Sequence, residues 1–161
     1  MKIHVFCVGG TIDKIYFDAK SEYEVGAPAI ANMLSQIAVN LEFEVTSLMA
    51  KDSLDMTDDD RELIAQAVRT CDADKIIITH GTDTMPETAR SLTGFNAKTI
   101  VLTGALAPAI FKDSDAMFNV GGALAAVQAL DSGVFIVMNG ELFDGMNVRK
   151  DVENNCFRKL S

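Results

Sequence analysis

The segment KIIIT at residues 75–79, followed directly by HGTDT at residues 80–84, decides the fold. Its first half is almost continuously apolar, which is typical of a strand that helices cover on both faces. Its second half is polar and built of small residues, as is common where a parallel strand ends beside a binding site. The same change from apolar to small and polar recurs along the chain. This recurrence predicts a parallel sheet whose chemistry lies at one edge.

Four further apolar runs flank this segment, at residues 2–8, 41–49, 99–103 and 134–138. Three of them are almost continuously apolar, whereas the run at 41–49 alternates apolar with charged side chains and so predicts an edge strand. Segments of helical periodicity separate the runs, at about 30–38, 57–71, 86–92 and 120–130. The second of these segments has the clearest start, because Thr57 and Asp60 stand at the spacing of a near capping box.

Alternating strands and helices require right-handed crossovers and predict an α/β fold. The simplest arrangement is a doubly wound, flavodoxin-like, mainly parallel five-stranded sheet in the order 2-1-3-4-5, with helices on both faces. No linker or repeat divides the chain, so we expect residues 1–161 to form a single domain. We expect the polar tail at 141–161 to wrap the sheet edge or to line a site.

The composition fits a folded domain and argues against several classes of partner. Of the 161 residues, 48% are hydrophobic and 23% are charged, which is unlike a disordered chain. A formal net charge of -9 repels phosphate backbones and anionic lipid, so we expect no nucleic-acid or membrane partner. No apolar stretch suits a membrane span or a signal peptide, and the three scattered cysteines suit a reducing compartment, which predicts a cytoplasmic protein.

No metal or cofactor site is predicted. The two histidines stand alone and the cysteines form no C-x-x-C pair, so no set of ligands has the spacing of a zinc site. The glycine pair Gly9 and Gly10 lies outside any G-x-G-x-x-G or G-K-[ST] pattern, so no nucleotide fingerprint is present.

Hydroxyls, carboxylates and glycines follow four of the apolar runs, at residues 9–11, 51–55, 80–84 and 104–105. A threonine hydroxyl beside a lysine and an aspartate could act as a nucleophile, with backbone donors aimed at an oxyanion. However, Thr82 and Asp83 could equally form a turn or a helix cap. The residues alone leave both interpretations open.

Seven motifs of the sequence together resemble those of a known protein family. They are VGGTI at 8–12, SEYEVG at 21–26, DSLDM at 52–56, THGTDTMPETA at 79–89, VLTGALAP at 101–108, DSDAMFN at 113–119 and FDGMNVRK at 143–150. In order and spacing they resemble the bacterial-type L-asparaginase family over nearly the whole chain. The resemblance implies an amidohydrolase that converts the side-chain amide of asparagine, or a related amide, to aspartate and ammonia without a cofactor.

The resemblance also implies the residues of the site. The implied catalytic residues are Thr11, Tyr23, Thr82, Asp83 and Lys150, and the implied substrate contacts are Gly10, Ser53, Asp55, Gly81 and Ala105. By the same resemblance, Thr11 attacks the amide carbonyl with Tyr23 beside it, and Lys150 helps to deprotonate Thr82. Asp83 also binds the substrate amino group. Which threonine attacks first, and whether glutamine replaces asparagine, stay open.

Family members are usually longer, with a second, C-terminal domain that we expect this chain to lack. In them a neighbouring subunit supplies an acidic residue to the site, so we expect a homo-oligomer that binds a small-molecule substrate. Leu54 stands where many members place a polar ligand. The alternative function is a non-catalytic amino-acid-binding or interaction domain derived from the same fold.

Overall fold

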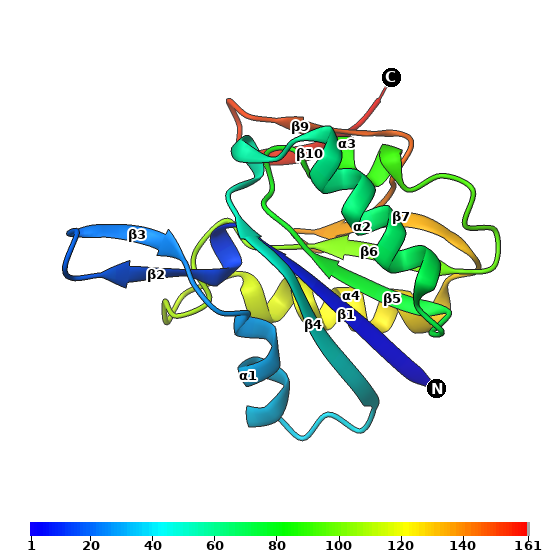
Figure 1. Ribbon diagram of the computed structural model, residues 1–161, viewed down its shortest axis with the longest axis horizontal. Helices are drawn as coiled ribbons and strands as arrows, with labels where there is room; N and C mark the ends of the chain where they lie inside the picture. Colours follow the sequence, from blue (N-terminus) through cyan, green and yellow to red (C-terminus); the bar gives the residue numbers. More distant parts are fainter. Residues whose placement is uncertain (161) are drawn as a thin grey trace.

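The computed structural model describes residues 1–160, and its centre is a six-stranded sheet in the order β4-β1-β5-β6-β7-β8 (Figure 1). The strands are β1 (Lys2–Gly9), β4 (Glu42–Lys51), β5 (Lys75–Thr79), β6 (Thr99–Thr103), β7 (Gly133–Met138) and β8 (Glu141–Asp144). The first five are parallel to one another, and β8 runs antiparallel to β7.

The predicted order of the parallel strands is confirmed, because β4, the second predicted strand, lies at the edge of the sheet beside β1. The predicted number of strands is wrong, because β8 adds a sixth strand at the other edge. Asn139 and Gly140 form the turn that starts it, with φ angles of 54° and 81°. Positive φ at both central residues is what a tight hairpin turn requires. The chain therefore reverses onto β7 at once.

Helices cover both faces of the sheet, as expected of a doubly wound fold (Figure 1). They are α1 (Ala29–Gln36), α2 (Asp58–Thr70), α3 (Met85–Ser91) and α4 (Ala116–Ala129). Buried side chains of α2 and α3 pack in one hydrophobic cluster, and those of α1 and α4 pack in a second. The predicted start of α2 is confirmed, because Thr57 and Asp60 exchange both hydrogen bonds of a capping box.

Two hairpins lie outside the main sheet. The first pairs β2 (Lys14–Phe17) with β3 (Glu22–Val25) and projects from the body just beyond the end of β1 (Figure 1). The second pairs β9 (Val148–Asp151) with β10 (Cys156–Lys159) and lies against α3. The polar tail thus extends the sheet edge through β8 and then returns over the end of the sheet. Within residues 1–160, no helix combines the length and the hydropathy needed to cross a bilayer.

Candidate active site

All candidate residues except Tyr23 and Lys150 follow β1, β4, β5 or β6, whose carboxyl ends meet at one edge of the sheet. Backbone hydrogen bonds tie the loops together at this edge. The Gly10 amide donates to the Lys51 carbonyl at 2.9 Å, and the His80 amide donates to the Thr103 carbonyl at 2.9 Å. The sequence prediction that polar segments far apart in the chain converge here is therefore confirmed.

Two glycines bring the loops into direct contact. Gly10 has a φ of 92°, and a Cβ added to it would lie 2.4 Å from the Cα of Gly81. A Cβ on Gly81 would in turn lie 2.6 Å from the Cβ of Ser53. Neither position has room for a side chain, and φ at Gly10 favours glycine as well. The backbones of Gly10 and Gly81 and the buried Ser53 thus form one packed group.

Lys150 reaches this edge from β9 and meets Thr82. Its Nζ donates to the Thr82 Oγ1 at 3.2 Å and to the Asn155 Oδ1 at 2.9 Å. The same Nζ lies 5.1 Å from the centre of the Phe157 ring, in the range of a cation–π contact. Thr82 itself is buried, with 7% of its surface exposed. A lysine and a threonine 68 positions apart in the sequence are therefore paired, with the threonine buried and the lysine half-buried.

Burial lowers the pKa of Lys150 below its usual value, and the nearby charge of Asp83 partly opposes that shift. Desolvation disfavours the ammonium form, because a charge loses its hydration when it is buried. A lysine that loses its proton more readily can accept one from a neighbouring hydroxyl. The pair formed by Lys150 and Thr82 therefore has the chemistry of a base and a nucleophile.

Thr11 and Tyr23 belong to other elements than the pair formed by Lys150 and Thr82. Thr11 is half-buried and opens a short 3-10 helix, η1 (Thr11–Asp13), directly after Gly10, just as Thr82 follows Gly81. No hydrogen bond joins Thr11 to Tyr23 or to Thr82 in the part of the chain that the structure describes. Tyr23 lies on β3 with 48% of its surface exposed, and its ring packs edge-on against Tyr16 and Phe111. The structure does not bring these two residues into the Lys150 pair.

The remaining predicted residues are spread around the edge. Asp83 is half-buried beside Thr82, and Ala105 is 1% exposed in the hydrophobic cluster of α1 and α4. Asp55 is exposed at the end of a second 3-10 helix, η2 (Ser53–Asp55). It lines an open hollow of about 600 Å³ together with Tyr23. Asp55 and Tyr23 thus share an outer hollow beside the inner group of Gly10, Ser53 and Gly81.

Two neighbouring side chains that are not among the predicted site residues hold the loops in place. The Thr84 hydroxyl donates to the Ser53 carbonyl at 2.7 Å. Asp115 accepts from the amides of Leu106 and Ala107 at 3.0 Å each, which fixes the segment after β6. Both residues lie within the quoted motifs, at 79–89 and 113–119, but a motif does not say which of its polar atoms meet.

His80 is fully buried below the site and is not available as a base. Its Nδ1 lies 2.7 Å from the Gly81 carbonyl, and its Nε2 lies 2.8 Å from the Thr88 hydroxyl. Burial lowers its pKa to about 4, so the ring is neutral near pH 7. A neutral ring with both nitrogens engaged fixes the carbonyl of Gly81. His80 therefore supports the contact between Gly81 and its neighbours.

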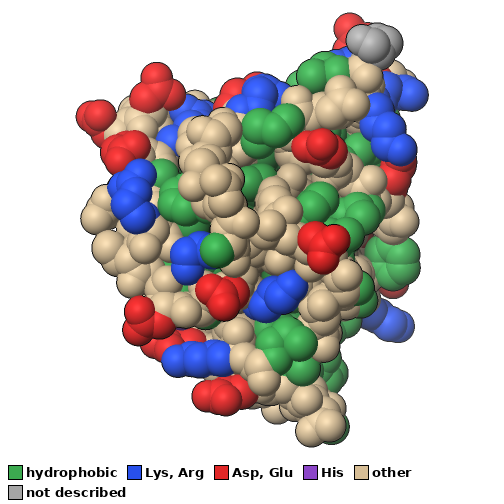
Figure 2. Space-filling view, turned by 90° about the vertical axis from the view of Figure 1, so that its right-hand side faces the viewer, with side chains coloured by type: hydrophobic (Ala, Val, Ile, Leu, Met, Phe, Trp, Pro, Cys, Tyr) green, Lys and Arg blue, Asp and Glu red, His purple; other side chains and the backbone are tan. Residues whose placement is uncertain are grey.

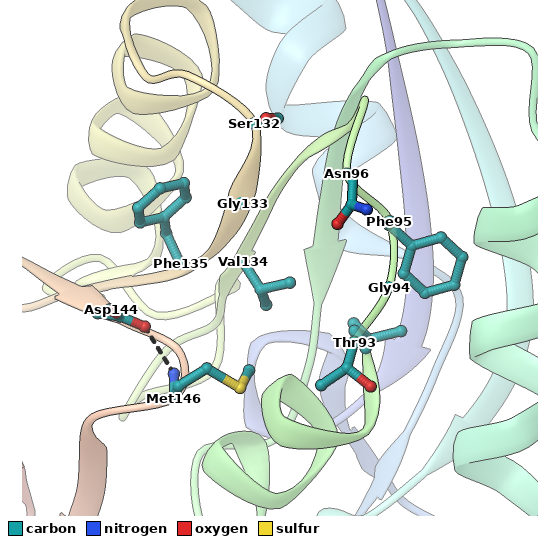
Figure 3. A pocket seen from close by; sticks show the side chains of 11 residues that line it. Thr93, Gly94, Phe95, Asn96, Ser132, Gly133, Val134, Phe135, Asp144 and Met146 are labelled. Atoms are coloured by element: carbon teal, nitrogen blue, oxygen red, sulfur yellow. Dashed lines mark hydrogen bonds between the residues drawn. The ribbon is translucent and has the colours of Figure 1, made fainter.

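A separate hollow of about 560 Å³ lies at the opposite end of the sheet, where β6 and β7 begin (Figure 3). It is lined by residues that precede β6, by the start of β7 and by the end of β8, and its Asp144 carboxylate accepts from the Met146 amide at 2.8 Å. On the face where the parallel strands begin, acidic, basic and hydrophobic side chains are interspersed (Figure 2).

Within residues 1–160, no group of three or more His, Cys, Asp or Glu side chains could hold a metal ion.

Comparisons with known proteins agree with one another. The family model described as "Asparaginase, N-terminal" matches residues 2–158. The chain is 34% identical to L-asparaginase 2 of Escherichia coli over 161 residues, covering 92% of this chain and 46% of that protein. It is 38% identical to the glutaminase-asparaginase of Pseudomonas aeruginosa over 94 residues, covering 55% of this chain and 26% of that protein.

A solved structure shares the fold. The thermostable L-asparaginase from Thermococcus kodakarensis superposes with a TM-score of 0.86 at 27% identity, covering 99% of this chain and 51% of that one. This chain therefore spans about half the length of the relatives that it matches over most of its own length.

Proposed function

This chain belongs to the asparaginase family, and on that premise we propose that it hydrolyses the side-chain amide of asparagine, or of a closely related amide, through a threonine nucleophile. The observation that carries the proposal is the distance of 3.2 Å between the Lys150 Nζ and the Thr82 Oγ1. A structural turn or cap needs no half-buried lysine at its hydroxyl, whereas a nucleophile needs a base within hydrogen-bond reach.

The proposed reaction has two halves. Neutral Lys150 accepts the hydroxyl proton of Thr82 while the Oγ1 attacks the amide carbon, and the carbonyl oxygen takes up the negative charge. Backbone amides at the glycine-lined edge stabilise that oxyanion. The intermediate collapses, the proton passes from Lys150 to the leaving nitrogen, and ammonia departs. Water then attacks the threonine ester, giving the free carboxylate and restoring the hydroxyl.

Thr11 is the second candidate nucleophile. It lies next to Gly10, which packs on Gly81, the residue before Thr82. The position of Lys150 favours Thr82 as the first attacker, and Thr11 then contacts the substrate or serves the second half of the reaction. Single Thr11→Val and Thr82→Val variants, compared in ammonia release, separate these roles.

The substrate is a small amino acid in this proposal. The buried Ser53 hydroxyl would hold its carboxylate and Asp83 its amino group, with Gly10 and Gly81 closing the pocket by backbone contacts. The relatives' names include both L-asparaginase and glutaminase-asparaginase, so both amides are substrates to test. One additional methylene is a weak basis for discrimination in any pocket, so we expect the protein to act on both amides.

Two further expectations belong to the proposal. The family resemblance implies a homo-oligomer, so we infer that a second copy of the chain contributes to the site. Within residues 1–160, all three cysteines are free thiols, which supports a reducing compartment such as the cytoplasm.

The test is ammonia release by the purified protein with asparagine and with glutamine. Thr82→Val and Lys150→Met should each lower kcat by on the order of 100-fold or more, because each removes half of the base and nucleophile pair. Thr93→Val, at an exposed threonine far from this edge, is the matched control and should behave as wild type. Equal ammonia release by the wild type and by a Thr11→Val, Thr82→Val double variant would exclude the mechanism.

The binding alternative has its own outcome in the same experiment. A domain that only binds an amino acid releases no ammonia, yet aspartate raises its thermal midpoint because a ligand that binds the folded state stabilises it. An enzyme gives both ammonia and stabilisation.

A further inference from the structure

We propose that Asp13 is a positioning residue of the threonine site: its carboxylate fastens the base of the β2–β3 hairpin to the start of α1 and so sets where Thr11 and Tyr23 stand. This inference deepens the proposed function and rests on it. It assigns a role to a buried acidic side chain that the motifs did not single out.

The backbone of Asp13 joins the two ends of the hairpin. Its amide donates to the Gly10 carbonyl at 3.1 Å, and its carbonyl accepts from the Gly26 amide at 2.8 Å. The hairpin begins at the next residue, Lys14, and its second strand ends just before Gly26. Asp13 is therefore the point, here called the hinge, at which the hairpin that carries Tyr23 joins the body of the protein. Thr11 lies two residues before this hinge.

The side chain of Asp13 connects this hinge to a helix that is packed in the core. Its Oδ1 accepts from the Ala29 amide, the first amide of α1, at 2.8 Å. The N-cap residue of α1, Pro28, makes no side-chain cap, and the first turn holds no acidic residue, so the Asp13 carboxylate fills both roles from a distance. Ile30 of α1 and Ile12 of η1 are both buried in the same hydrophobic cluster. The hinge thus rests on fixed parts of the fold.

The burial of Asp13 points to a specific use. Asp13 is 2% exposed, and within residues 1–160 no other acidic side chain is buried. Burial raises its pKa to about 6, which reflects an unfavourable place for a carboxylate. An exposed serine or threonine at position 28 could cap α1 without that cost. A cap supplied from residue 13 differs in one respect: it ties the helix to the hairpin.

The chain carries a spectroscopic reporter of this hairpin. Its only two tyrosines are Tyr16 and Tyr23, and it has no tryptophan. They pair across the two strands, with ring centres 5.4 Å apart, and Tyr23 also packs on Phe111. The tyrosine bands of the near-UV circular dichroism spectrum therefore come from the hairpin alone. A change in these bands reports that the hairpin has moved or loosened while the fold persists.

The experiment compares three variants with wild type by near-UV circular dichroism, kcat and KM for ammonia release, and urea unfolding. Asp13→Ala removes the acceptor and should lower kcat at least tenfold with a smaller change in KM, and reduce the tyrosine bands. Asp13→Asn keeps an acceptor for the Ala29 amide and should restore kcat to within about threefold of wild type, together with the bands. Asp18→Asn, at an exposed position on the same hairpin, is the matched control.

A fourth variant tests the same bond from its other end and covers the case in which Asp13→Ala does not fold. Ala29→Pro removes only the donor amide, at the first position of α1, where proline is tolerated. Pro28 before it has φ -55° and ψ 116°, a conformation that a following proline accepts. Ala29→Pro should lower kcat and reduce the tyrosine bands as Asp13→Ala does.

The outcomes separate this inference from the proposed function. If Ala29→Pro and Asp13→Ala both fold with wild-type tyrosine bands and wild-type kcat, Asp13 is not a positioning residue. If both lose stability while their bands and kcat stay as in Asp18→Asn, its role is structural and the inference is equally overturned. If wild type releases no ammonia, the proposed function fails, and the tyrosine bands alone still decide whether Asp13 holds the hairpin.

Discussion

Gly10 and Gly81 touch backbone to backbone at the carboxyl edge of the sheet, so that a Cβ on Gly10 would lie 2.4 Å from the Cα of Gly81. This contact joins the end of β1 to the end of β5, and Thr11 and Thr82 are the residues that follow the two glycines. Two hydroxyls from neighbouring strands can approach a common ligand only where no side chain separates the strand ends. The two glycines provide that approach.

Gly81→Ala should impair substrate binding more than chemistry. A methyl group at this position would lie 2.6 Å from the Cβ and 2.7 Å from the Oγ of Ser53, so Ser53 has to move. Because Ser53 is the proposed contact for the substrate carboxylate, KM should rise about tenfold or more, with a smaller loss of kcat and a stability loss of about 1–3 kcal/mol. Steady-state kinetics and urea unfolding measure these effects. An unchanged KM in the folded variant would contradict the assigned role of Ser53.

Gly121→Ala should raise the stability and leave the kinetics unchanged, so it serves as the control for Gly81→Ala. Gly121 lies inside α4 with nothing within 4 Å of an added Cβ, so alanine fits without strain. Alanine is favoured over glycine in a helix interior by about 0.5–1 kcal/mol. The free energy of unfolding in urea should rise by about that amount with kinetics unchanged. A lower value would show that α4 is constrained in a way its local geometry does not indicate.

The order of the parallel strands could be predicted because it follows from local patterns. The alternation at 41–49 marks β4 as an edge strand, and the spacing of Thr57 and Asp60 marks the start of α2. The sixth strand, β8, could not, because four residues after a tight turn give no periodicity to detect. The β2–β3 hairpin escaped detection for the same reason.

The part of the site that could be predicted consists of residues whose side chains have recognisable chemical roles. Lys150 came from the resemblance alone, since no pattern in the sequence says that β9 folds back over the end of β5 to meet Thr82. Asp13 was missed because an aspartate after a glycine pair is normally an exposed turn residue. It is buried beside η1 and the start of α1, which pack in one hydrophobic cluster. Such long-range burial is decided by the tertiary structure, so local sequence patterns do not report it.

The pH dependence of activity should report on Lys150. Burial lowers its pKa below the usual lysine value, so kcat/KM should rise with pH and reach its plateau below the pH at which a free lysine loses its proton. Lys150→Arg keeps the positive charge but cannot act as a base, and should lose both activity and the rising limb. Lys159→Arg, at an exposed lysine of the same hairpin, should leave the profile unchanged. A rising limb that persists in Lys150→Arg would assign the base elsewhere.

Two buried groups whose pKa values shift in opposite directions, Asp13 and His80, should determine how the stability changes below neutral pH. The pKa of Asp13 is raised from 3.8 in the unfolded chain to about 6. Its contribution to the free energy of unfolding is therefore fully present below pH 3.8 and is lost as pH rises through about 6. The pKa of His80 is lowered from 6.5 to about 4, so its contribution is present above 6.5 and is lost as pH falls through about 4. In wild type the two effects offset each other over nearly the same range.

Asp13→Asn should therefore expose the effect of His80. With the carboxyl group removed, the free energy of unfolding should fall by up to about 3 kcal/mol as pH decreases from about 6.5 to about 4, and wild type should change much less. The variant should also be more stable than wild type above about pH 6, because it no longer buries a charge. Urea unfolding at several pH values across this range, with Asp18→Asn as the control, measures both effects. Parallel curves for wild type and Asp13→Asn would mean that the Asp13 carboxyl group titrates as it does in the unfolded chain, and that its burial carries no electrostatic cost.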